Sequence, residues 1–139
     1  MVDVKALLAK LTRDIVQDST TNVLWSGAYY MSASHTANLS QNVSAQKHGI
    51  VLVWSAYADG AAQNYDWVHQ FIHKKHVQSH NGAGVGVFMA TANMGKVGDK
   101  YVYVHENKIT GNDNNHSTGT NSGITRANNY WVLRYVIGV

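Results

Sequence analysis

Apolar residues recur with helical spacing in one part of the chain, its first eighteen residues. The sequence there reads MVDVKALLAKLTRDIVQD, and the apolar positions follow one another at intervals of 3, 4, 3 and 4. This spacing predicts an amphipathic helix with a single apolar seam. The residues on that seam are Met1, Val4, Leu8, Leu11 and Ile15. Asp3, near the start, complements the helix dipole.

Such a helix either packs on its own domain or forms the end of an oligomeric stem. The seam covers two heptads, fewer than the three or four that are typical of a coiled coil. No segment after residue 20 shows helical spacing, and a lone helix beside an all-β domain would be unusual. We therefore favour the stem. We expect its oligomer interface to consist of Val4, Leu8, Leu11 and Ile15.

From Asn22 onward the pattern changes to short apolar or alternating segments separated by polar residues and glycine. β-Branched and aromatic residues dominate these segments, as is typical of strands. The chain contains no proline, so its turns depend on glycine and on short polar residues. The main predicted strands are residues 22–31, 49–58, 65–77, 85–92, 100–111 and 130–139.

These elements predict an all-β fold, an antiparallel β-sandwich or jelly-roll-like domain behind a short, coiled-coil-like N-terminal helix. Residues 1–20 form the helical stem segment and residues 21–139 the β domain. The most apolar strand is YWVLRYVIGV at 130–139, and we expect it at the centre of a sheet, because exposed apolar surface of that size drives association. Its expected antiparallel neighbour is 100–111, across the polar tract 112–123.

The amino-acid composition limits the functional classes to which this protein can belong. Only 14% of the residues are charged, against about a quarter in typical soluble domains. Uncharged polar residues must therefore cover most of the surface, which is common in robust extracellular or virion β-proteins. The chain has no cysteine, and its 11 basic residues are scattered without a nucleic-acid-binding motif. We expect no nucleic acid partner, no signal peptide and no membrane insertion.

Four closely spaced histidines raise the question of a metal site. They are His69, His73, His76 and His80. On a helix they would share one face and could bind a transition metal. Their aromatic and β-branched neighbours indicate a strand instead, and Lys74 and Lys75 would place two positive charges inside such a site. We expect surface histidines and no metal.

Motifs of known catalytic chemistry are absent from the sequence. It contains no G-x-S-x-G, no H-E-x-x-H and no P-loop, the phosphate-binding loop of nucleoside triphosphatases. GAGVGV at 82–87 lacks the third glycine of a dinucleotide-binding loop and precedes a strand. We expect a protein that is not an enzyme and needs no cofactor.

Aromatic residues beside short polar ones give the best indication of a binding surface. Aromatic rings stack on the C–H faces of sugars, while carboxylates, amides and imidazoles bond to sugar hydroxyls. The candidates for a saccharide platform are Tyr57, Asp59, Tyr65 and Asp66, with Asp113 and His116 as secondary contacts. The alternative is that the aromatic residues belong to a core or an interface, and that the tract around Asp113 is a solvated loop.

Four segments carry a resemblance to a known family. They are WSGAYYM at 25–31, GIVLVWS at 49–55, KYVYVHENKITG at 100–111 and WVLRYVIGV at 131–139. Together they resemble a C-terminal receptor-binding domain in tail-fibre and baseplate proteins of siphophages and prophages of Gram-positive bacteria, over roughly residues 22–139. The resemblance implies a homotrimeric virion domain at a fibre or baseplate tip, exposed outside the cell and made in the bacterial cytoplasm. It also implies contact with host cell-wall saccharide.

The expected function is therefore host adhesion through cell-surface saccharide, without catalysis. The N-terminal end would connect the domain to other tail or baseplate proteins. A structural trimerisation or tip module without a ligand is the first alternative. A cell-wall hydrolase is the second, because two carboxylates are enough for such an enzyme.

Overall fold

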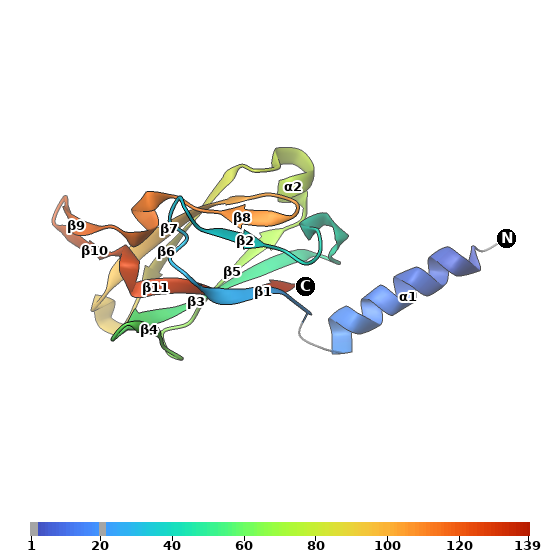
Figure 1. Cartoon of the computed structure of the whole chain (residues 1–139), viewed down its shortest axis with the longest axis horizontal. Coiled ribbons are helices and arrows are strands. Elements are labelled where there is room, and N and C mark those ends of the chain that lie inside the picture. The colour runs from blue at the N-terminus through green and yellow to red at the C-terminus, as the bar shows by residue number, and fades with distance from the viewer. Residues whose placement is uncertain (1–2, 20–21) are drawn as a thin grey trace.

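The computed structural model describes residues 3–19 and 22–139, with helix residues 14–19 described by their backbone only. Helix α1 (Val4–Ser19) projects away from the β part of the molecule (Figure 1). Its first turn is capped by Asp3, whose carboxylate Oδ1 accepts hydrogen bonds from the backbone N–H groups of Lys5 and Ala6 at 3.1 and 3.2 Å. This is the usual role of an aspartate at a helix N-cap.

The first sheet contains the C-terminal strand at its centre. Strand β11 (Trp131–Gly138) lies between β1 (Asn22–Tyr29) and β3 (Gly49–Ala58), and β5 (Val68–His73) pairs with the other side of β3. All of these pairings are antiparallel. The predicted central position of the terminal strand is confirmed. The short strand β4 (Ala61–Ala62) extends the sheet as a hairpin with the end of β3.

The second sheet has the order β2-β8-β7-β6, and it corrects one predicted pairing. Its strands are β2 (Thr36–Asn38), β8 (Lys108–Thr110), β7 (Val97–Val104) and β6 (Gly84–Ala90). The segment 100–111 was expected beside the terminal strand. It instead folds back on itself as the β7–β8 hairpin. Polar residues 105–107 form the turn, where the His105 N–H donates to the Lys108 carbonyl at 2.9 Å.

The remaining elements are short and connect the sheets. A hairpin of β9 (Thr118–Asn121) and β10 (Ile124–Ala127) stands at one end of the β part. The 3-10 turns are η1 (Val43–Ala45), η2 (Ala92–Met94), η3 (Asp113–His116) and η4 (Asn128–Tyr130). Helix α2 (Lys75–His80) was not expected, because the sequence pattern predicted a strand up to residue 77.

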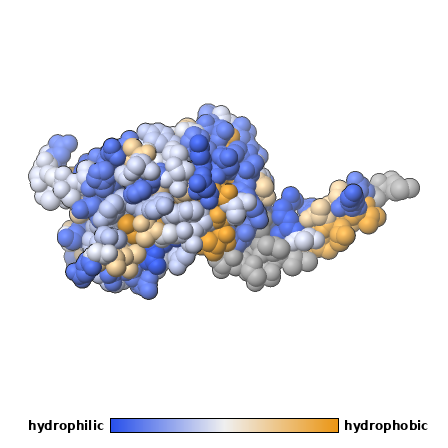
Figure 2. Space-filling model, viewed as in Figure 1, coloured by the Kyte–Doolittle hydropathy of each residue, from blue (hydrophilic) through white to orange (hydrophobic). Residues whose placement is uncertain are grey.

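Side chains from both sheets form one buried cluster. Its members from the first sheet include Leu24, Ile50, Leu52, Trp54, Ile72, Trp131, Leu133 and Val136. Its members from the second sheet are Ala37, Met89, Val102, Val104 and Ile109. The chain is thus mostly β, with antiparallel sheets and one amphipathic N-terminal helix, as predicted. Figure 2 shows hydrophobic residues gathered along α1, whereas the visible face of the β part is mostly hydrophilic.

A lysine lies among these apolar residues. Lys100 is 1% exposed, and its Nζ donates to the backbone carbonyls of Tyr30 at 3.1 Å and Asn115 at 2.6 Å. The same ammonium lies over the rings of Tyr30 and Trp54, 5.6 and 5.4 Å from their centroids. Burial lowers the pKa of Lys100 to about 7, against a smaller opposing effect of the Asp99 carboxylate.

Two buried asparagines complete the polar contacts of this region. The Asn115 side chain donates to the carbonyls of Met31 and Tyr101 and accepts from the Tyr101 N–H. The Asn128 side chain accepts from the Asp99 N–H at 2.8 Å and donates to the Asn114 carbonyl at 2.7 Å. Each of these hydrogen bonds joins a loop to β7 or to another loop. The two asparagines therefore hold the loop at Met31 and the turns η3 and η4 in place.

Candidate functional site

A group of two aromatic rings and an arginine lies on the first sheet, and we call Trp67, Arg134 and Tyr135 the aromatic platform. The rings of Trp67 and Tyr135 are nearly parallel, at 15°, with centroids 6.2 Å apart. The Arg134 guanidinium lies 5.2 Å from the Trp67 ring and 5.8 Å from the Tyr135 ring. Trp67 is 39% exposed, and Tyr65, which precedes it in the chain, is 48% exposed. The platform therefore presents an aromatic surface to solvent.

Arg134 is held in position by three hydrogen bonds. Its Nη1 donates to Ser55 Oγ at 2.9 Å, to the Gln63 carbonyl at 3.1 Å and to Asn64 Oδ1 at 3.3 Å. The pairing of β11 with β3 shifts register between Leu133 and Tyr135, so Arg134 is the extra residue of a β-bulge. A bulge redirects a side chain locally. Because of this bulge, the adjacent side chains of Arg134 and Tyr135 both contact the Trp67 ring.

A shallow hollow of about 350 Å³ lies beside the platform. Its lining consists of Val53, Trp67, His69, Tyr135 and Ile137. Aliphatic side chains and two aromatic rings make it chiefly apolar, while the His69 imidazole adds a hydrogen-bonding group. Such a surface suits a ligand that has an apolar face and a polar rim.

The segment before Trp67 is tied to Tyr130 and to the first residue of β11, Trp131. Asp66 has a left-handed backbone conformation, with φ of 56°. Its carboxylate Oδ2 accepts a hydrogen bond of 2.6 Å from the Tyr130 hydroxyl, and its carbonyl accepts one of 3.3 Å from Trp131 Nε1. Burial, followed by the hydrogen bond to Asp66, raises the pKa of Tyr130 to about 12. Asp66 is thus an anchor of this segment as well as a candidate contact.

The other two residues of the predicted main platform have different surroundings. Tyr57 is half-buried and packs edge-on against Tyr30, with ring centroids 5.3 Å apart. Asp59 and Gly60 are the two turn residues of the β3–β4 hairpin, with φ of 55° and 76°. Positive φ at both positions is typical of a type I′ turn, which favours Asp-Gly. The Asp59 side chain is exposed. The preference of the turn for Asp followed by Gly is enough to explain why an aspartate occurs at this position.

The two secondary candidates lie in η3. Asp113 Oδ1 accepts a hydrogen bond of 2.9 Å from the Ala33 N–H, which ties η3 to the loop after β1. His116 is exposed at the end of η3. Burial, the charge of His116 and the charge of Lys100 lower the pKa of His35 in the same loop. Asp113 and His116 are therefore neighbours of the loop that carries His35.

The four closely spaced histidines are divided between two elements. His69 and His73 lie on β5, whereas His76 and His80 lie on α2. Within residues 3–19 and 22–139, no group of three histidine, cysteine or acidic residues is placed to hold a metal ion. In the same part of the chain, no helix is long and apolar enough to cross a membrane.

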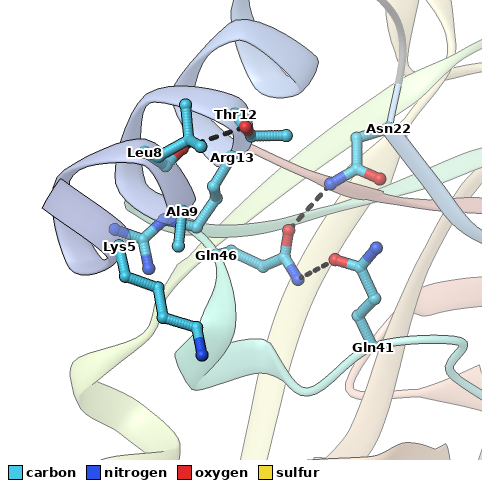
Figure 3. Close-up of a pocket in the computed structure, with 8 residues that line it drawn as sticks. All are labelled: Lys5, Leu8, Ala9, Thr12, Arg13, Asn22, Gln41 and Gln46. Atoms are coloured by element: carbon cyan, nitrogen blue, oxygen red, sulfur yellow. Dashed lines mark hydrogen bonds between the residues drawn. The ribbon is translucent and has the colours of Figure 1, made fainter.

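The apolar seam of α1 is open to solvent. Val4, Leu8 and Leu11 are 72%, 61% and 53% exposed, and Leu7 on the flank of the seam is 56% exposed. The side chain of Ile15, the fourth residue of the predicted interface, lies outside the described residues. A groove of about 550 Å³ separates α1 from the β part, with Leu8 and Arg13 on one wall and Gln41 and Gln46 on the other (Figure 3).

Sequence reasoning placed Trp67 in the aromatic-rich segment 57–67 but not among the contact residues, and it missed Arg134 and Tyr135. An arginine inside the otherwise apolar terminal strand was a usable signal for Arg134. Its contact with Trp67 joins positions far apart in the sequence, and no local pattern reports such a contact.

A scan against models of known protein families finds no match to this chain, and a search of curated proteins finds no significant relative.

Proposed function

We propose that this protein is a host-recognition domain of a phage tail or baseplate, and that it binds cell-surface saccharide without catalysis. The observation that supports this proposal is the aromatic platform beside its shallow hollow. The proposal includes a β-sandwich of jelly-roll type, in which the two sheets enclose the shared apolar cluster. It also includes a homotrimer attached to the rest of the tail through its N-terminal end.

The platform matches the chemistry of a sugar ring. The C–H face of a pyranose can lie on Trp67, while its hydroxyls reach the Arg134 guanidinium and the His69 imidazole. Arg134 is already fixed by three hydrogen bonds, so little side-chain freedom is lost when a ligand binds. Single sugar sites are weak, and three copies in one particle would bind a cell wall through avidity.

The open seam of α1 supports the oligomeric part of the proposal. Leucines that are more than half exposed in one chain can be buried when the same helices pack together, as in coiled coils. The same observation favours a second candidate function, a structural trimerisation or tip module without a ligand. The two functions differ in whether the platform binds wall material.

Binding to purified walls of Gram-positive cells tests the proposal. We expect Trp67→Ala to reduce the fraction of protein that sediments with walls at least tenfold, because it removes the largest stacking surface. Tyr101→Ala is the matched control, since this ring is similarly exposed, at 43%, but lies on the second sheet. Thermal melts of both variants verify folding. If folded Trp67→Ala binds as well as the unmodified protein, the platform is not the binding surface. If the unmodified protein binds no walls, the structural-module function is favoured.

A further inference from the structure

Arg126 lies where two surface hollows meet, and neither hollow shares a residue with the aromatic platform. It belongs to β10, the second strand of the β9–β10 hairpin. One hollow is polar and the other is apolar, and the Arg126 side chain contributes to both. A site of this kind can recognise two different parts of one ligand.

The polar hollow has a volume of about 240 Å³. Its lining includes the hydroxyl residues Ser117, Thr118 and Thr120 and the amide residues Asn114 and Asn121. The Ser117 hydroxyl also bonds to Asn114, and the Thr120 hydroxyl to Thr125. Hydroxyls and amides both donate and accept hydrogen bonds, as the hydroxyls of a sugar do. Arg126 is the one charged residue among those that line this hollow, so the hollow favours an anion.

The guanidinium of Arg126 lies beside the carboxylate of Asp99, whose backbone is held by a buried asparagine. Arg126 Nη1 lies 3.4 Å from Asp99 Oδ1, and both side chains are partly exposed, at 43% and 36%. The Asp99 backbone N–H donates to the buried Asn128 side chain. A guanidinium has five N–H donors, so contact with Asp99 through Nη1 leaves it able to bind an incoming anion through another edge.

The apolar hollow has a volume of about 160 Å³. Phe88 and Ile124 line it and are 62% and 49% exposed, while Val97, which also lines it, is buried. Asp99 adds a carboxylate to the lining. A space of this size accepts a small apolar group such as the methyl of an acetyl substituent. Covering Phe88 and Ile124 would remove apolar surface from water, which favours binding.

We propose that Arg126 is the centre of a second saccharide site, selective for sugars that carry both an anionic group and an acyl group. The proposal rests on the proposed saccharide-binding function but uses different residues. The guanidinium binds the carboxylate or phosphate, the polar hollow binds hydroxyls, and Phe88 and Ile124 contact the acyl methyl. A nucleic acid would require a row of cations along its backbone, whereas Arg126 is the one cation among the residues that line these hollows.

Nuclear magnetic resonance titration of the full chain with three sugars tests this site. N-Acetylmuramic acid carries a carboxylate, N-acetylglucosamine 1-phosphate carries a phosphate, and N-acetylglucosamine is neutral. We expect one or both acidic sugars to shift the amide signals of residues 117–121 and Arg126 and to bind at least tenfold more tightly than the neutral sugar. The stronger acidic ligand identifies the preferred anionic group. Equal affinity for all three sugars would overturn the proposal.

Arg126→Gln removes the guanidinium, and Lys75→Gln on α2 is its control because it makes the same change in net charge at an exposed position. We expect a tenfold or greater loss of acidic-sugar affinity in Arg126→Gln and no change in Lys75→Gln. Arg126→Lys, which keeps the charge without the planar fork, should lie in between and serves as the test if Arg126→Gln does not fold. Equal losses of affinity in Arg126→Gln and Lys75→Gln would show that net charge alone attracts the sugar.

Phe88→Ser tests the acyl contact. It should weaken binding of N-acetylglucosamine 1-phosphate at least threefold and leave binding of glucosamine 1-phosphate unchanged. Equal weakening of both sugars would contradict the assignment of the apolar hollow.

The two saccharide sites can fail separately. If Trp67→Ala loses wall binding but no acidic sugar binds at Arg126, the second site is wrong and the proposed function stands. If acidic sugars bind through Arg126 while Trp67→Ala retains wall binding, the platform is wrong and the Arg126 site stands alone.

Discussion

The two apolar ends of the chain have opposite environments. In β11, Trp131, Leu133 and Val136 are completely buried between β1 and β3. In α1, Leu8 and Leu11 are 61% and 53% exposed. Both segments are evident from the sequence as apolar, yet only the strand is covered by its own chain. An apolar pattern in the sequence therefore identifies a surface that can be buried, whereas the fold decides whether the same chain buries it.

Deleting the C-terminal strand and deleting the N-terminal helix should have the most different effects on solubility and thermal stability. Removal of residues 131–139 takes out the strand between β1 and β3 together with two completely buried large side chains, Trp131 and Leu133. We expect insoluble protein without a cooperative melt. Removal of residues 1–19 should leave the melting temperature of the β part nearly unchanged. Solubility and circular dichroism melts measure both outcomes. A soluble, cooperatively melting protein without residues 131–139 would show that β11 is peripheral.

The buried lysine should make the stability of the β part depend on pH. The pKa of Lys100 is about 7 in the folded protein and 10.5 when exposed, so between these values the unfolded chain binds more protons. Stability therefore rises with pH from about 7 to 10.5, by on the order of 5 kcal/mol if the whole difference is realised. Above pH 10 the raised pKa of Tyr130 acts in the opposite direction, because the folded state disfavours the phenolate.

Denaturant unfolding at a series of pH values measures this dependence. Lys100→Met should flatten the rise in stability, while Lys75→Met at an exposed position should leave it intact. A rise that persists unchanged in Lys100→Met would assign it to other groups. Removing α1 should leave the rise unaltered, which would confine the effect to the β part.

Polar replacement of the helix seam should affect assembly instead of folding. We expect Leu8→Ser together with Leu11→Ser to lower the oligomeric state or its stability, since each buried leucine contributes about 1.5–3 kcal/mol. Ala6→Ser with Lys10→Ser, at exposed positions off the seam, is the matched control. Light scattering gives the mass of each assembly. A monomeric mass for the unmodified protein at micromolar concentration would contradict the oligomeric stem.

The smallest effect should come from the helix cap. Asp3→Ala removes the acceptor for the N–H groups of Lys5 and Ala6 and should destabilise α1 by about 1 kcal/mol. Asp3→Asn retains an acceptor oxygen and should cost less. The helical circular dichroism signal during heating reports the change. An identical loss in both variants would indicate that the charge near the helix dipole, not the hydrogen bond, is responsible.

Local sequence patterns predicted where strands and helices lie better than they predicted which strands pair with each other. The strand at 49–58 and the helix at the N-terminus follow from apolar spacing, and both are confirmed. The pairing of 100–111 with the terminal strand was wrong, because the choice between two sheets depends on contacts distant in sequence. Helix α2 was missed because it has only six residues with a single apolar one, Val77, and because the aromatic and β-branched residues before it indicated a strand.

The candidate site was less accessible to sequence reasoning than the fold. The segment from Tyr57 to Trp67 was found by composition, yet a turn conformation explains the position of Asp59, and Asp66 is held by Tyr130. Arg134 belongs to the platform through a bulge in β11, and a bulge leaves no pattern in the sequence. The sequence pattern does not mark Lys100 as buried, because its burial depends on two backbone carbonyls supplied by separate loops.

The central place of β11 also bears on how the protein is made. Strands β1 and β3 leave the ribosome well before β11, since Ala58 and Trp131 are separated by most of the β part. At roughly 5–20 residues per second, synthesis of the intervening chain takes about 4–15 s. During that interval the two strands have unpaired edges where β11 will later insert, and such edges can pair with other chains. Expression at reduced temperature, or with a chaperone that covers nascent strands, should therefore improve the yield of folded protein.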